Sequence, residues 1–441
     1  MAYQDPQSTE SDQKGKASTS YASSYSRLTK DNLYMILALW MQDFPEDKPE
    51  KNPADNPQRN NPYMKVGAVL VLPNDRSYAV DCSRNGVHAV ARLLMMHHDV
   101  LEDCKVFVSR KPCSFCTKLL VQSKVKRVFY LPIEPEYRPL HDFEEETFRV
   151  DNLFKVSSIS QSVFVPKVGA NVIKDIQNKL QTPKEKRIEM EDSLKKRYWI
   201  DDWMKKAKDK LPWQALDEEM RSQVKIDFTE MVTWMASILV GTKKGYNFKL
   251  ESPDKSVAFD PTQGIEKEQS YRLITLAKFL AERTDDPKTG VGAVIINKKK
   301  EIVGLGWNGF PSKALYGEFP RASDKDKDVP DKKYPYSIHA EQNALLMRNT
   351  KNIEGGTLFV TKTPCDECTT LLEMMGIETV ILGAEFIEGK TKKGISYNKF
   401  SDAVKGGKFA CFSLVSEISG AKRNLDVEFE DQERKRERKD C

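Results

Sequence analysis

The sequence carries the same pattern twice, and this internal repeat constrains the fold more than any other feature. The apolar segment at residues 65–71 recurs at 290–296, and a histidine followed by a Pro-Cys-x-x-Cys motif occurs twice. The two histidines, His88 and His339, are 251 residues apart, and the paired cysteines are 252 apart. A chain of 441 residues is also too long for one ordinary core. The repeat therefore predicts two domains with the same fold.

Within each copy, short strands rich in β-branched residues alternate with helices. We expect strands at 106–108 and 127–131 in the first copy and at 357–360 and 379–382 in the second, with helices that open at the His and Cys motifs. This alternation predicts an α/β fold: two three-layer α/β/α domains, each a mixed sheet flanked by helices, joined by a helical linker.

The chain divides into five expected parts. These are a polar tail at 1–30, a first domain at 31–165, a helical linker at 166–253, a second domain at 254–425 and a basic tail at 426–441. Between its first strand and its histidine, the second copy holds 26 residues more than the first. We expect this insertion, within 307–337, to cover or shape a site.

Composition excludes several classes of function. Lys and Arg total 70 against 65 for Asp and Glu, and this near balance gives no strong sign of polyanion binding. No apolar run approaches the roughly 20 residues that cross a bilayer, so we expect a soluble protein with no membrane partner. Two CxxC pairs without a secretory signal favour metal or redox chemistry in a reducing compartment. Basic residues at 434–439 resemble a nuclear localisation signal, so the expected location is cytoplasmic or nuclear.

The second copy carries the ligands expected of a catalytic zinc centre. A catalytic zinc ion takes three protein ligands and keeps a fourth position for water, and His339, Cys365 and Cys368 fit that count. Two cysteines three positions apart at a helix start lie one turn apart, where the helix dipole favours thiolates. The sequence therefore predicts Zn²⁺ as cofactor. A structural zinc or a redox dithiol is the alternative, but structural zinc sites usually offer four protein ligands.

Glu341 lies two positions after His339, so both side chains can serve one site only at the first turn of a helix. We expect Glu341 to act there as general acid and base, not as a ligand. The signature His-x-Glu followed by Pro-Cys-x-x-Cys is that of zinc nucleobase deaminases.

The first copy repeats the ligands as His88, Cys113 and Cys116 but has Val90 where the second has Glu341. Valine moves no proton, so deamination should fail there. The first copy could still bind zinc, because all three ligand side chains are present. Four basic residues give this copy a basic rim: Arg84, Arg92, Arg110 and Lys111. They motivate the hypothesis of a regulatory nucleotide site, and a purely scaffolding domain is the alternative.

These motifs resemble those of the cytidine and deoxycytidylate deaminase superfamily, over nearly all of residues 30–430. The segments Gly304–Pro311 and Lys333–Ala344 look like the deoxycytidylate deaminase branch. The resemblance implies a cytidine-deaminase-like fold for both domains and a homo-oligomer. It also implies that Asn308 contacts the deoxyribose and that Trp307 or Tyr336 helps enclose base and sugar, although the same segment is compatible with a plain turn.

The expected reaction is zinc-dependent hydrolytic deamination of a free cytosine deoxynucleotide to its uracil form. The two-copy arrangement resembles tandem members of the superfamily, and this resemblance favours dCTP as the substrate. The next candidate substrate is dCMP, and cytidine and deoxycytidine stay possible substrates. One rival is a polynucleotide cytosine deaminase, which is not expected because residues 360–364 offer no aromatic platform for stacked bases. The other is a non-enzymatic zinc scaffold, which the costly burial of Glu341 beside a metal disfavours.

Overall fold

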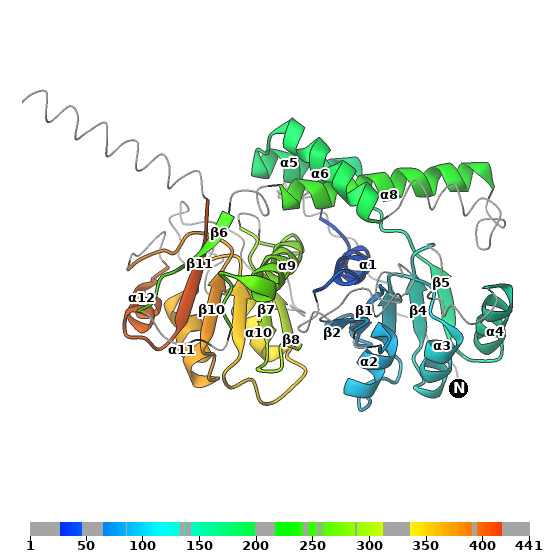
Figure 1. Cartoon of the computed structure of the whole chain (residues 1–441), viewed down its shortest axis with the longest axis horizontal. Helices are drawn as coiled ribbons and strands as arrows, with labels where there is room; N and C mark the ends of the chain where they lie inside the picture. Colours follow the sequence, from blue (N-terminus) through cyan, green and yellow to red (C-terminus); the bar gives the residue numbers. More distant parts are fainter. Residues whose placement is uncertain are drawn as a thin grey trace, which may run out of the picture.

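A computed structural model describes most of the chain. The described residues are 27–45, 65–84, 86–132, 136, 143–198, 217–240, 246–253, 257, 259–286, 289–311, 336–389 and 395–416. Figure 1 shows two sheets side by side, each with helices on its faces, and a further group of helices above both. Residues 1–26, the basic tail and most of the insertion in the second copy lie outside the described residues, as does the basic segment at 434–439. The predicted tail at 1–30 is too long, because Leu28 is buried and Lys30 begins the first helix.

The first domain is built on a five-stranded mixed sheet with strand order β2-β1-β3-β4-β5. Strand β1 runs antiparallel to β2 and β3, and β3, β4 and β5 are parallel. The strands are β1 (Gly67–Val71), β2 (Ser77–Cys82), β3 (Lys105–Val108), β4 (Arg127–Tyr130) and β5 (Ser160–Val163). The helices are α1 (Lys30–Met41), α2 (Ala89–Met96), α3 (Ser114–Gln122) and α4 (Phe143–Lys155).

The second domain repeats this sheet with one strand added, in the order β6-β11-β10-β9-β7-β8. Its strands are β6 (Tyr246–Leu250), β7 (Gly292–Ile296), β8 (Ile302–Trp307), β9 (Thr357–Val360), β10 (Thr379–Leu382) and β11 (Ala410–Ser416). Its helices are α9 (Gly264–Ala281), α10 (Ala340–Leu346), α11 (Asp366–Met374) and α12 (Asn398–Lys405). Two mixed sheets flanked by helices confirm the predicted fold class.

The side chains of the central strands alternate between two cores, because successive residues of a strand point to opposite faces. In β7, Ala293 and Ile295 face a core private to the second domain, under α10 and α11. Val294 and Ile296 face the opposite layer and join a core that both domains share. Strand β1 divides its residues in the same way.

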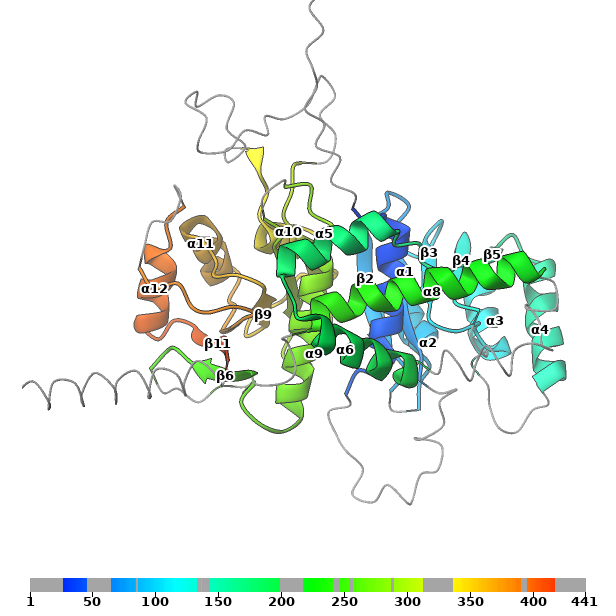
Figure 2. The same ribbon diagram turned by 90° about the horizontal axis from the view of Figure 1, so that it is seen from above.

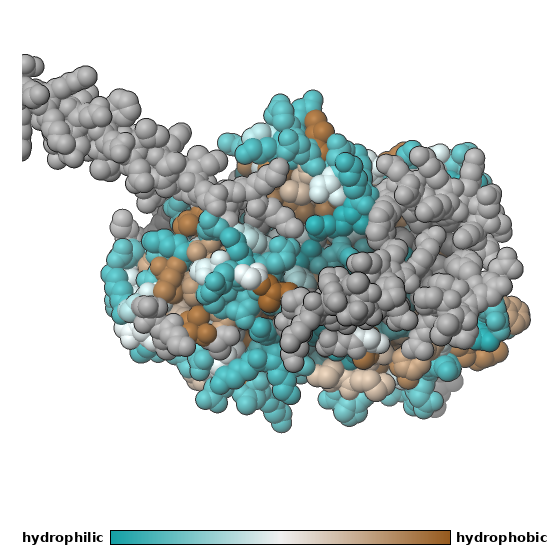
Figure 3. Space-filling model, viewed as in Figure 1, coloured by the Kyte–Doolittle hydropathy of each residue, from teal (hydrophilic) through white to brown (hydrophobic). Residues whose placement is uncertain are grey.

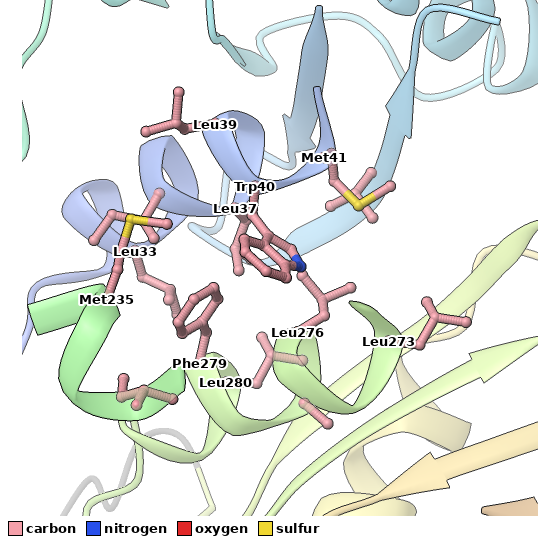
Figure 4. Packing of buried hydrophobic residues seen from close by; sticks show 14 of the residues in the cluster. Leu33, Leu37, Leu39, Trp40, Met41, Met235, Leu273, Leu276, Phe279 and Leu280 are labelled. Carbon is pink, nitrogen blue, oxygen red and sulfur yellow. The ribbon is translucent and has the colours of Figure 1, made fainter. Parts of the chain in front are cut away.

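The shared core holds the two domains together. Trp40 of α1 packs edge-on against Phe279 of α9, with ring centroids 5.5 Å apart, and Phe279 stacks on Trp234 of α8 (Glu218–Leu239) at 5.4 Å. Figure 4 shows α1 and α9 facing each other across these apolar side chains. The corresponding first helices of the two copies therefore pack on each other, and α8 covers the seam (Figure 2).

The predicted helical linker requires one correction. Helices α5 (Ala170–Leu180), α6 (Lys184–Arg197) and α8 lie in the range 166–253, but so does β6, which pairs antiparallel with β11. In β6, Phe248 is buried and Lys249 is exposed. This two-residue alternation is typical of a half-buried strand, and the helical interpretation passed over it. Among the described helices, none combines the length and hydrophobicity needed to cross a bilayer.

Candidate active site

Two helix starts meet at the candidate site of the second domain. His339 is the N-cap of α10, and Cys365 is the N-cap of α11, which follows β9. The side chain of Gln342 accepts a hydrogen bond from the backbone N–H of His339 at 2.9 Å, which fixes the first turn of α10. Cys368 lies one turn into α11 and is fully buried. The prediction that the His and Cys motifs open helices is confirmed.

The three predicted ligands converge on one point. The Nδ1 atom of His339 lies 3.2 Å from the Sγ atom of Cys365 and 3.3 Å from that of Cys368. A tetrahedral zinc ion with ordinary bond lengths separates a nitrogen and a sulfur ligand by about 3.5 Å. The three side chains therefore fit Zn²⁺, with Nδ1 as the imidazole donor. Among the described residues, no fourth His, Cys, Asp or Glu joins this cluster.

The electrostatics of the three ligands favour a bound cation. A hydrogen bond from Cys368 is the main reason that the pKa of Cys365 falls to about 4, and the same interaction raises the pKa of Cys368. The hydrogen bond with Cys365 raises the pKa of His339 to about 9. Negative charge therefore gathers on the sulfur atom of Cys365, as a thiolate ligand requires, while Cys368 keeps its proton in the absence of a cation.

Glu341 stands next to these ligands without being one of them. It occupies the first turn of α10, its side chain is 4% exposed, and its carboxyl group forms a hydrogen bond with Cys368. Burial raises the pKa of Glu341 to about 7, against the opposing influence of His339. A carboxyl group held in a dry environment beside a metal site has the position that a general acid and base needs.

The residues predicted to contact substrate have contacts with other parts of the second domain. Asn308 is buried, and its side chain accepts a hydrogen bond from the backbone N–H of Val291 at 2.7 Å and donates one to the carbonyl of Thr289 at 2.8 Å. Trp307, the last residue of β8, accepts a hydrogen bond at its carbonyl from the Asn343 side chain of α10. Tyr336 is partly buried, three residues before His339. Their contact with substrate stays a prediction.

The first domain contains an equivalent cluster with one addition. His88 is the N-cap of α2 and Cys113 that of α3, and His88 Nδ1 lies 3.3 Å from the sulfur atoms of both Cys113 and Cys116. Glu136 joins them as a fourth buried side chain. Sequence reasoning missed Glu136, because it belongs to no spacing motif and lies 20 residues beyond the second cysteine.

The predicted basic rim of the first domain is engaged by acidic side chains. Arg84 and Arg92 both pair with Asp81, at 3.3 and 2.9 Å. Lys111 pairs with Asp151 of α4 at 2.6 Å. The fourth member, Arg110, is buried at 2% exposure. A nucleotide that bound here would have to compete with these carboxylates.

Comparison with known proteins finds relatives that are named as deaminases. A family described as the cytidine and deoxycytidylate deaminase zinc-binding region matches residues 51–132 and 267–384, once in each copy. A zebrafish protein named "Cytidine and dCMP deaminase domain-containing protein 1" is 27% identical over 85% of this chain and 88% of its own length. The deoxycytidylate deaminase of mycobacteriophage D29 is 34% identical over 26% of this chain and 92% of its own length.

Human deoxycytidylate deaminase is 37% identical over 25% of this chain, and the match spans 61% of the human protein. Among solved structures, the dCMP deaminase of cyanophage S-TIM5 aligns at 26% identity with a TM-score of 0.22, over 26% of this chain and 82% of that protein.

Proposed function

Because the chain belongs to the cytidine and deoxycytidylate deaminase family of zinc-dependent enzymes, we propose that its second domain converts a free cytosine deoxynucleotide to the uracil form. The observation that carries the proposal is the three-ligand cluster of His339, Cys365 and Cys368 beside buried Glu341. Three ligands leave one position for a reacting water, and a catalytic rather than a structural zinc site needs that position.

The residues of the chain divide the work as follows. His339, Cys365 and Cys368 hold zinc, which when bound supplies Lewis-acid activation of water. Glu341 takes a proton as oxygen from water adds to C4 of the pyrimidine, and delivers it to N3. It then takes a second proton from the hydroxyl group now on C4 and passes it to the amino group. The C4–N4 bond breaks, a carbonyl group forms at C4, and the products are ammonia and uracil. Burial keeps bulk water away from this carboxylate, so its proton transfers stay directed at the substrate.

Within this reaction we favour dCTP as substrate, then dCMP. The reason for placing dCTP first is the two-copy arrangement of this chain, which resembles tandem members of the superfamily. A zebrafish protein named for cytidine and dCMP deaminase domains is similar over 85% of this chain. The likeness to deoxycytidylate deaminases, which covers 25% and 26% of this chain for the human and phage proteins, supports the monophosphate. Trp307 and Tyr336 are proposed to enclose base and sugar, and Asn308 to contact the deoxyribose while its amide holds the loop before β7.

A substrate panel tests the proposal. The zinc-loaded protein is incubated with dCTP, dCMP, deoxycytidine, cytidine and single-stranded DNA, and the uracil products are separated by chromatography. We expect turnover of a free deoxynucleotide, with the highest kcat/KM for dCTP. If DNA is the only substrate turned over, the protein is a polynucleotide cytosine deaminase and this proposal is wrong. Turnover of none, by a protein with its zinc in place, would favour the scaffold.

We propose that the first domain is catalytically inactive and supports assembly. Val90 is buried where the second domain has Glu341, and the core shared by α1, α8 and α9 makes each domain part of the other's packing. A homo-oligomer is proposed as well. Figure 3 shows brown surface over the part of the first domain that carries α2 and α3, helices on which Met95, Met96 and Phe115 are exposed.

Two measurements test this assignment. Calorimetry of dCTP binding to zinc-loaded Glu341→Ala protein should find a single site per chain, and two sites would favour the regulatory hypothesis. Sedimentation equilibrium should give a mass above that of one chain. A monomer over the working concentration range would remove the oligomer from the proposal.

A further inference from the structure

Glu136 places a carboxylate inside the first metal cluster. It follows β4 in the chain, and its backbone N–H donates a 2.9 Å hydrogen bond to the carbonyl of Lys111, two residues before Cys113. This bond ties the segment that carries Glu136 to the segment that leads into α3. Glu136 is thereby held against the start of the helix whose first turn carries two sulfur ligands.

The contacts of Glu136 are with the other members of the cluster. Its side chain is 0% exposed, and among the described residues its carboxylate group faces His88 and Cys116. One oxygen lies 3.0 Å from Nδ1 of His88, the same atom that faces both sulfur atoms. Enclosing a carboxylate and two sulfur atoms together is costly, and a cation at the centre of the four donor atoms would balance their charge.

The second domain shows the opposite arrangement at the equivalent position. With the spacing of 252 that relates the cysteines, Glu136 corresponds to Glu388. Glu388 is exposed and pairs with Lys405 of α12 at 2.6 Å. It is absent from the cluster formed by His339 and the two cysteines. The same residue type therefore turns inward in one copy and outward in the other.

We propose that Glu136 is the fourth protein ligand of a closed, structural zinc site in the first domain. One nitrogen, two sulfur and one oxygen donor complete a tetrahedral shell, so no position is left for a reacting water. The first domain is then inactive for two independent reasons: it lacks the proton carrier at Val90, and its fourth position is filled. Its zinc serves folding by joining α2, α3 and the segment after β4.

Zinc release from the full-length protein tests the ligand assignment. The purified protein should contain two zinc ions per chain by mass spectrometry, and a chromogenic chelator should remove them in a fast and a slow phase. Glu136→Ala should speed the slow phase by at least about tenfold. The control is Glu388→Ala at the matching repeat position, which should leave both phases unchanged. Equal slow phases in the wild-type and Glu136→Ala proteins would overturn the proposal, as would a single zinc ion per chain.

A second measurement needs no substitution at Glu136 and so does not depend on that variant folding. In a Cys368→Ala protein loaded with Co²⁺, the first site is the one complete ligand set. The visible bands of this cobalt should not shift when azide is added, because a fourth protein ligand leaves no exchangeable position. A shift with azide in this protein would show an open site and overturn the proposal.

Discussion

At the scale of single residues, equivalent positions of the two copies differ in their burial and in the residues that they contact. Glu136 and Glu388 are the same residue at equivalent positions, yet one is enclosed with a histidine and two cysteines and the other pairs with a surface lysine. Val90 and Glu341 are both buried at the start of equivalent helices, but only the carboxyl group can move protons. Under the proposed assignments, the chemistry of each domain depends on these two side chains and not on its fold.

Replacing Glu341 with Gln should abolish turnover while zinc content stays at the wild-type level. The amide keeps the size of the side chain but cannot take a proton, and general acid–base catalysis contributes about 10²- to 10⁴-fold to a rate. Steady-state kinetics with zinc quantification measures both effects. The control is Glu354→Gln, an exposed glutamate just before β9, which should keep full activity. Adding Val90→Glu to Glu341→Gln should restore nothing, and recovered turnover would contradict the proposed closure of the first site.

Lys278 of α9 should make stability depend on pH in the alkaline range. Burial lowers the pKa of Lys278 from 10.5 to about 8 in the folded protein. The cavity that it lines also contains Lys179, Lys362, Glu282 and Glu385. Below pH 8 the folded state bears the full cost of a buried charge, and this cost disappears as pH rises from about 8 to 10.5.

Lys278→Met should therefore unfold at higher urea concentration than wild type at pH 7. The difference should shrink towards zero near pH 10, as measured by urea titrations at both values. A difference that grows with pH would show that the charged form of Lys278 stabilises the fold.

The sequence is sufficient to predict the three ligands and the position of Glu341, because their spacing fits two helix starts and the motif is the signature of zinc nucleobase deaminases. It is not sufficient to identify Glu136 as a cluster member. Glu136 and Glu388 occupy equivalent positions, and their different directions follow from tertiary contacts: the bond from the Glu136 backbone to Lys111 and the pairing of Glu388 with Lys405. No local pattern encodes that difference.

At the scale of elements, one layer of each domain depends on how closely a helix approaches the first strand of the sheet. Gly67 and Gly292 begin the equivalent strands β1 and β7. A Cβ atom at Gly292 would lie 1.8 Å from the carbonyl oxygen of Ala277 in α9, and one at Gly67 would lie 2.1 Å from that of Ala38 in α1. Only glycine allows the helix backbone this close.

Gly292→Ala should lower the free energy of unfolding by about 1–3 kcal/mol, because α9 must move off the sheet to admit the methyl group. Urea unfolding followed by circular dichroism measures the change. Lys351→Ala, at an exposed position, should be neutral. Unchanged stability in Gly292→Ala would mean that α9 shifts at no cost.

The strands and helices of the repeat could be predicted because their periodicity is strong, whereas β6 offers only a short two-residue alternation. Its five residues sit in a charged stretch, and what makes them a strand is pairing with β11, which lies about 160 residues further along the chain. Long-range pairing of this kind has no signature in a local window.

At the scale of the whole molecule, the two domains behave as one packed unit. The indole N–H of Trp40 donates a 3.1 Å hydrogen bond to the carbonyl of Arg272, and the Arg272 guanidinium lies over the indole ring, 4.1 Å from its centroid. The repeat predicts two domains, but not that their first helices face each other, since an amphipathic helix does not specify its partner. The predicted linker supplies α8 to this shared core, so it is a structural part of both domains.

Trp40→Ala should uncouple the domains. Removing a buried indole costs about 3–5 kcal/mol, and here it also strips the ring from beneath the buried Arg272. We expect calorimetry to resolve two unfolding transitions where the wild type shows one. Turnover should persist below the first transition, because the catalytic helices α10 and α11 pack on the opposite face of the second sheet, in a core of their own.

The control variant Trp40→Phe keeps an aromatic ring between the two domains and loses the hydrogen bond of the indole N–H, so it should retain a single transition at a modestly lower temperature. One unshifted transition in Trp40→Ala would mean that the domains are held together elsewhere, and turnover lost with the seam would mean that the first domain supports catalysis through more than packing.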